Sequence, residues 1–101
     1  PGSLKNIIDW TSRQDITALK HKTALLLCAT TGSRGGIVGL DHLRSPLACL
    51  QLHVFNRAFP LSQCQNAFTQ NRLAVEKQQN QLQSIVTDFV TFTNKLTNTI
   101  P

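Results

Sequence analysis

The chain has 101 residues, of which 41% are hydrophobic and 15% charged, and its formal net charge is +5. This length suits one domain and is too short for two, and the composition is typical of folded rather than disordered proteins. The longest apolar run, residues 24–29, is far shorter than the roughly 18 residues that a membrane-spanning helix needs. We therefore expect one folded domain with no membrane span.

The first three residues, Pro-Gly-Ser, are typical of the remnant of a cleaved affinity tag. On this interpretation residues 4–101 form a single helical domain that is a fragment of a larger protein. The cysteines, Cys28, Cys49 and Cys64, are odd in number, and the sequence has no Asn-x-Ser/Thr sequon. Both observations favour a reducing, intracellular compartment, either cytoplasm or nucleus.

Helix signals dominate the first half of the chain. Residues 4–10 have the spacing of a short leading helix. Thr11-Ser12 followed by Asp15 resembles a capping signal, which predicts a helix from about residue 13 to a C-cap at Gly32. Residues 32–39 hold four of the five glycines and predict a loop.

A second helix is expected after this loop. Ser45 suits the N-cap and Pro46 the first helical position, where its missing N–H has no cost. Apolar residues at helical spacing then continue to about Arg57, and Pro60 follows them. The pattern predicts a central helix that is buried on more than one side.

Residues 63–99 contain neither glycine nor proline and predict a long C-terminal helix. Apolar residues recur there every seven positions, as in a coiled coil. A continuous helix of this length would be roughly 55 Å long, so either it breaks near residues 78–81 or it projects and pairs with another helix. Residues 90–93 also alternate as a strand would, but the seven-residue spacing favours helix.

No catalytic or metal-binding group is predicted. Cys49 and His53 are one helical turn apart, and a thiol near an imidazole on a buried helix is more often structural than catalytic. No two cysteines are spaced as zinc ligands are, and the five acidic residues are scattered. We therefore expect no enzyme active site, no metal and no cofactor.

The glycine-rich loop is the one segment with a ligand-binding pattern, because glycines expose backbone N–H groups that can cradle phosphate. It matches neither common nucleotide-binding motif, and although Gly32 to Gly35 has the Gly-x-x-Gly form of KH-type RNA-binding loops with Arg34 inside it, the strands of a KH module are not visible in the sequence. An ordinary helix–helix connection is therefore the preferred interpretation of this loop. The alternative function, a small basic nucleic-acid-binding domain, rests on the basic residues instead. Its expected contact residues are Lys20, Lys22, Arg34 and Arg44.

Together these patterns predict an all-α fold, a small bundle of four or so helices with a long amphipathic, coiled-coil-like C-terminal helix. The preferred function is a non-catalytic protein-interaction, assembly or scaffold module of a larger intracellular protein. Its partner would be another protein or a second copy of itself, with no membrane and no small-molecule substrate. The expected contact stripe comprises Val75, Leu82, Ile85, Phe89, Phe92 and Leu96.

Overall fold

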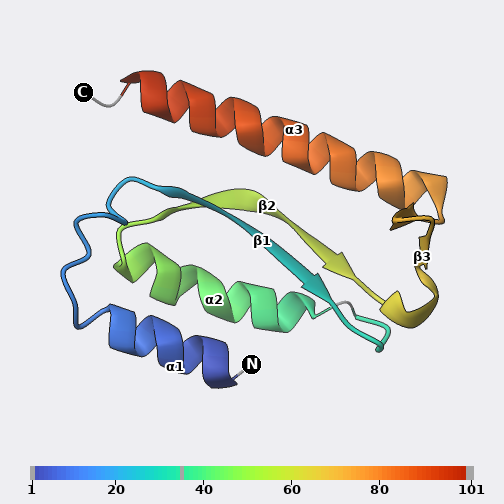
Figure 1. Cartoon of the computed structure of the whole chain (residues 1–101), viewed down its shortest axis with the longest axis horizontal. Coiled ribbons are helices and arrows are strands. Elements are labelled where there is room, and N and C mark those ends of the chain that lie inside the picture. Colours follow the sequence, from blue (N-terminus) through green and yellow to red (C-terminus); the bar gives the residue numbers. More distant parts are fainter. Residues whose placement is uncertain (1, 35, 100–101) are drawn as a thin grey trace.

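The computed structural model describes residues 2–34 and 36–99 and shows helices alternating with strands (Figure 1). In chain order the elements are α1 (Gly2–Thr11), β1 (Thr23–Ala29), α2 (Ile37–Cys49), β2 (His53–Leu61), the 3-10 turn η1 (Cys64–Asn66), β3 (Phe68–Thr69), β4 (Arg72–Leu73) and α3 (Glu76–Thr99). The all-α prediction was therefore wrong, and the fold class is α/β. None of the described helices is long and apolar enough to cross a membrane.

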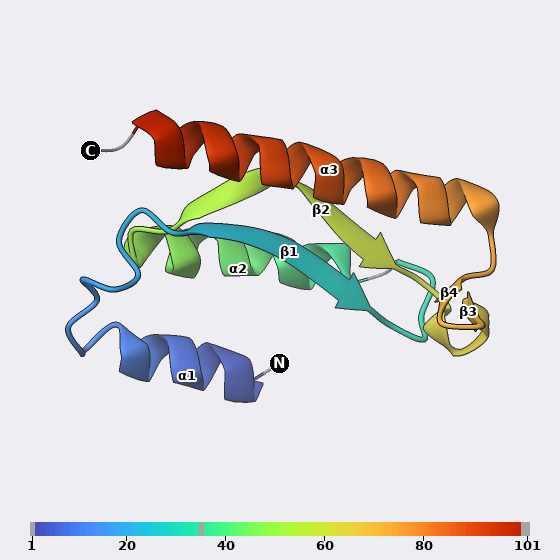
Figure 2. The same ribbon diagram turned by 45° about the horizontal axis from the view of Figure 1, so that its top comes forward.

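A parallel pair of strands forms the centre of the molecule. β1 and β2 run in the same direction, with Thr23 opposite His53 at one end and Ala29 opposite Leu61 at the other. Helix α2 connects them, as a crossover between parallel strands requires. Figure 2 shows three layers, in which α1 and α2 cover one face of the sheet and α3 covers the other.

The predicted first long helix is instead a set of turns followed by β1. The apolar residues of β1 follow one another without polar residues between them, and 7 residues are too few to show the 3.6-residue period of a helix. Such runs are typical of parallel strands, because helices cover both faces of a parallel sheet. The short leading helix is present as α1.

The predicted central helix is divided between two elements. Helix α2 begins directly after Gly36 and already contains Pro46 in its interior, so Ser45-Pro46 marks neither end of a helix. The chain then turns into β2, where Phe55, Phe59 and Leu61 are buried. These three residues lie an even number of positions apart, which is the two-residue period of a strand.

The predicted C-terminal helix is shorter than expected, because the antiparallel pair β3–β4 uses residues 68–73. Helix α3 is continuous through residues 78–81, and its helical assignment of residues 90–93 is confirmed. Its 24 residues are roughly 36 Å long, which fits within the 41 Å longest dimension of the molecule. Neither a break nor a projecting helix is needed.

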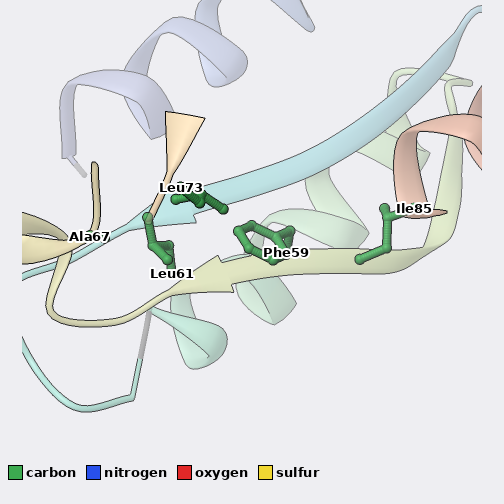
Figure 3. Packing of buried hydrophobic residues seen from close by; sticks show 5 residues of the cluster. All are labelled: Phe59, Leu61, Ala67, Leu73 and Ile85. Atoms are coloured by element: carbon green, nitrogen blue, oxygen red, sulfur yellow. The ribbon is translucent and has the colours of Figure 1, made fainter. Parts of the chain in front are cut away.

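The heptad stripe of α3 packs on the chain's own sheet rather than forming a coiled coil. Ile85 is only 2% exposed and belongs to one cluster with Phe59, Leu61, Ala67 and Leu73 (Figure 3). The rings of Phe89 and Phe92 lie 5.6 and 5.3 Å from the ring of Phe55. Leu82 packs against the same cluster and Leu96 is half-buried, whereas Val75 precedes the helix and is 52% exposed.

Candidate functional site

Two loops meet where β1 and β2 end. We call residues 30–34 and 62–66 the carboxyl-end loops, and Figure 1 shows both at the same end of the sheet. Backbone hydrogen bonds join them: the N–H of Cys64 donates to the C=O of Thr30 at 2.9 Å, and that of Gln63 to the C=O of Gly32 at 3.0 Å. In α/β folds ligands bind outside the carboxyl ends of the strands, so this edge is the first candidate site.

Gly36 sets the shape of the first loop. Its φ of 79° is left-handed, and it stands immediately before the first residue of α2. A Cβ atom here would overlap Sγ of Cys28 and press on the methyl group of Thr30. The position therefore requires glycine, which lets the loop turn tightly over the end of β1 and point the start of α2 at this edge.

Three consecutive backbone N–H groups, those of Gly32, Ser33 and Arg34, are hydrogen-bond donors at this edge. Within residues 2–34 and 36–99, no group accepts a hydrogen bond from the backbone N–H of Gly32, Ser33 or Arg34. Arg34 is exposed and forms no ion pair with a described carboxylate. The amino end of α2 adds partial positive charge. Such a set favours a ligand rich in oxygen acceptors.

An apolar hollow of about 240 Å³ lies at the same end of the strands, where Ala29 ends β1 and Leu61 ends β2. Leu27, Cys28 and Ala29 of β1 form part of its wall, and Phe68 of β3 is 60% exposed at it. Its remaining lining comes from Phe59, Leu61, Leu73 and Leu82. The edge thus presents polar donors and an apolar surface side by side, as a ligand with an aromatic ring and an oxygen-rich tail would need.

The residues predicted for nucleic-acid contact do not form one patch. Arg34 lies in a carboxyl-end loop, whereas Lys20 and Lys22 precede β1 at the opposite end of the strands. Arg44 lies on α2, where its side chain donates to the C=O of Phe55 at 2.8 Å. Cys49 and His53 are also separated, since one ends α2 and the other begins β2.

Sequence reasoning identified the glycine-rich loop but misread its surroundings. The decisive signal is the order of three features: the apolar run at residues 24–29, the glycine-rich loop, and a helix beginning at Ile37. Reading the run as helix removed the strand that a ligand-binding loop of this kind follows. No group of three or more metal-ligating side chains occurs among the described residues.

Comparison with known proteins identifies the family of the chain. The model of the NADPH-dependent FMN reductase family matches residues 1–66, which run from the first residue through η1. The chain is also 39% identical over 90 residues to an NAD(P)H-dependent FMN reductase of Pseudomonas aeruginosa. That alignment covers 83% of this chain and 49% of the relative, so the chain spans about half the relative's length.

These matches overturn the predicted function. A non-catalytic interaction or scaffold module, the absence of an enzyme and the absence of a small-molecule substrate were all wrong, because the matching family is described as NADPH-dependent FMN reductase and the relative is named an NAD(P)H-dependent FMN reductase. The nucleic-acid alternative fails on the same finding. The match includes residues 1–3, whose origin as a tag remnant stays a prediction. The chain belongs to the NADPH-dependent FMN reductase family.

Proposed function

We propose that this chain forms the flavin-binding part of an NAD(P)H-dependent FMN reductase and that its carboxyl-end loops hold the flavin. One observation carries this proposal: the glycine-rich loop has backbone N–H groups that donate to no described residue, and it lies where the parallel strands end. The relative's name supports the choice of FMN and of NAD(P)H as the reductant.

The residues present suit FMN in both halves of that molecule. The N–H groups of Gly32 to Arg34 and the guanidinium of Arg34 are donors for its phosphate or for the carbonyl oxygens of its ring. The carboxyl-end loops contain no aspartate or glutamate that would repel a phosphate. The apolar hollow next to them offers a surface against which a flat ring can pack.

Bound FMN would supply the redox chemistry, accepting a hydride from NAD(P)H. The chain's own contribution is to bind and orient the flavin. Gly36 keeps the loop close to the strand, and the hydrogen bonds between the two loops hold their donors in place. A preorganised loop of this kind avoids the entropy loss of ordering it on binding.

The test is a titration with FMN, followed by flavin fluorescence, together with NADPH oxidation measured with FMN as acceptor. Arg34→Gln should weaken FMN binding by about fivefold, which is the loss of one exposed charged contact. Arg13→Gln is the matched control, because it removes the same charge from a residue that packs over Trp10 away from the loops. Equal FMN affinity in the two variants would contradict the proposed position of the flavin.

The predicted intracellular location forms part of this proposal. Cys28, Cys49 and Cys64 are all free thiols, and NADPH is an intracellular reductant. Labelling of the thiols in intact cells before lysis would test it, because a cytoplasmic chain should retain all three in the reduced form.

A further inference from the structure

A second hollow lies at the opposite end of the strands. We call it the amino-end hollow; it has a volume of about 330 Å³ and lies where the chain enters β1. In both views the carboxyl-terminal end of α3 lies close to this entry (Figures 1 and 2). Its lining residues are Lys20, His21, Lys22, Thr23, Thr93 and Thr97. The seven residues of β1 separate it from the glycine-rich loop by roughly 20 Å, so the two sites are distinct.

The hollow is positively charged. Neither Lys20 nor Lys22 forms an ion pair with any described carboxylate, and no aspartate or glutamate lines the hollow. The carboxyl-terminal end of α3 contributes about half a negative charge at most. Two ammonium groups outweigh it, which leaves a net attraction for an anion.

Two imidazole rings meet beside the lysines. Nδ1 of His21 lies 3.4 Å from Nε2 of His53, and the rings stack with their centroids 5.6 Å apart. Backbone bonds hold this arrangement, since the N–H of His21 donates to Gln51 and that of His53 to Lys22. His21 adopts a left-handed φ of 68°, which is unfavourable for a residue with a Cβ atom and is maintained here by its neighbours.

Hydroxyl groups complete the set of donors. Oγ1 of Thr23 lies 2.9 Å from Oγ1 of Thr93, and Thr97 follows one helical turn later on the same side of α3. The second nitrogen of each ring, Nε2 of His21 and Nδ1 of His53, is used by no hydrogen bond to a described residue. Ammonium, imidazole and hydroxyl donors thus surround one space from several directions.

We propose that the amino-end hollow binds a phosphate group, through Lys20, Lys22, the His21–His53 pair and the hydroxyls of α3. A tetrahedral oxyanion has acceptors in several directions and matches such donors. Two imidazole nitrogens 3.4 Å apart could also ligate a metal ion, but the adjacent lysines repel a cation and no carboxylate compensates them. The charge therefore favours the anion.

The test is a titration of the 101-residue protein with inorganic pyrophosphate at constant ionic strength, followed by NMR. Saturable shifts are expected at His21, Thr23 and His53. The double variant Lys20→Gln/Lys22→Gln should bind about tenfold more weakly, because it removes both charged contacts. Its control, Lys5→Gln/Lys77→Gln, removes the same charge from α1 and α3 and should weaken binding by less than about twofold.

Three results would overturn the proposal. These are no saturable pyrophosphate binding, equal weakening in both double variants, or binding of zinc but not of pyrophosphate at the histidines. ADP serves as a second probe: tighter binding than pyrophosphate identifies a nucleotide phosphate, and equal binding identifies free phosphate, and either supports the site. Arg34→Gln separates this proposal from the flavin proposal, because it should change FMN affinity and leave pyrophosphate affinity unchanged.

Discussion

The two ends of the β1–β2 pair present different kinds of hydrogen-bond donor. At the carboxyl ends the donors are mainly backbone N–H groups of a glycine-rich loop, beside an apolar hollow. At the amino ends the donors are side chains, namely lysines, histidines and threonines. Backbone donors fixed by a tight turn suit a ligand that is held in one orientation, whereas flexible lysine side chains suit a simple anion.

The first prediction concerns the packing of α3 on the sheet that joins the two ends. Ile85→Ala should lower the free energy of unfolding by about 2–4 kcal/mol, because its side chain is 2% exposed and its removal leaves a cavity. Val90→Ala, at a position of α3 that is 49% exposed, should change it by less than about 0.5 kcal/mol. Urea denaturation measures both. Similar values would show that α3 does not pack as described.

The second prediction concerns the turn at the carboxyl ends. Gly36→Ala should destabilise the protein by about 1–3 kcal/mol and weaken FMN binding, because the new Cβ meets Cys28 in a left-handed conformation. Gly39→Ala is the matched control, since Gly39 lies inside α2 with open space around it. This substitution should stabilise the helix by about 0.5–1 kcal/mol. A melting temperature that falls in Gly36→Ala and rises in Gly39→Ala would confirm the difference.

The third prediction concerns the turns at the amino ends. Gln51 has a left-handed φ of 66° and accepts a hydrogen bond from His21 through its backbone alone. Gln51→Gly should therefore raise the free energy of unfolding by about 0.5 kcal/mol and leave pyrophosphate binding intact. The comparison variant is Gln81→Gly within α3, which should lower the free energy of unfolding by about 1 kcal/mol. A lower free energy of unfolding in both variants would mean that the turn at Gln51 is not strained.

The smallest effect is expected at Asp15, in the connection that leads to the amino ends. Hydrogen bonds from the side chain and then the backbone N–H of Thr17 hold the pKa of the Asp15 carboxyl below its ordinary value. The contact therefore stabilises the fold above the unfolded pKa, and this contribution is lost as the pH falls through the folded pKa. Thr17→Val should raise the pKa of Asp15, as an NMR titration would show. An unchanged pKa would exclude the hydroxyl as the main cause.

Local signals in the sequence were sufficient for part of the fold and for recognising the glycine-rich loop of the candidate site. The leading helix, the helical character of residues 76–99 and the ligand-binding pattern of the glycine-rich loop all follow from periodicity or from glycine's freedom. The strands could not be predicted in this way, because residues 23–29 show no alternation of apolar and polar side chains and the apolar residues of 46–57 also have a helical spacing. Their pairing joins segments about 30 residues apart, and such contacts leave no local signal.

The amino-end hollow could not have been predicted for the same reason. Lys20 and Lys22 are close in sequence, but His53 and Thr93 reach them only through the parallel pairing and the packing of α3. The stripe of α3 was identified correctly as apolar, yet its role depends on what it covers. In the structure Phe89 and Phe92 cover Phe55 of β2 and Ile85 lies in the core, so most of the residues that suggested a partner pack on the chain's own sheet.

The central claim is that the carboxyl ends of β1 and β2 hold FMN. The most direct measurement is an NMR titration of the ¹⁵N-labelled protein with FMN, with the backbone amides assigned. The claim predicts saturable shifts at Gly32, Ser33 and Arg34, whose N–H groups donate to no group within residues 2–34 and 36–99, and little change at His21 and His53. Saturable shifts confined to the amino-end hollow, or no shifts at the glycine-rich loop, would contradict it.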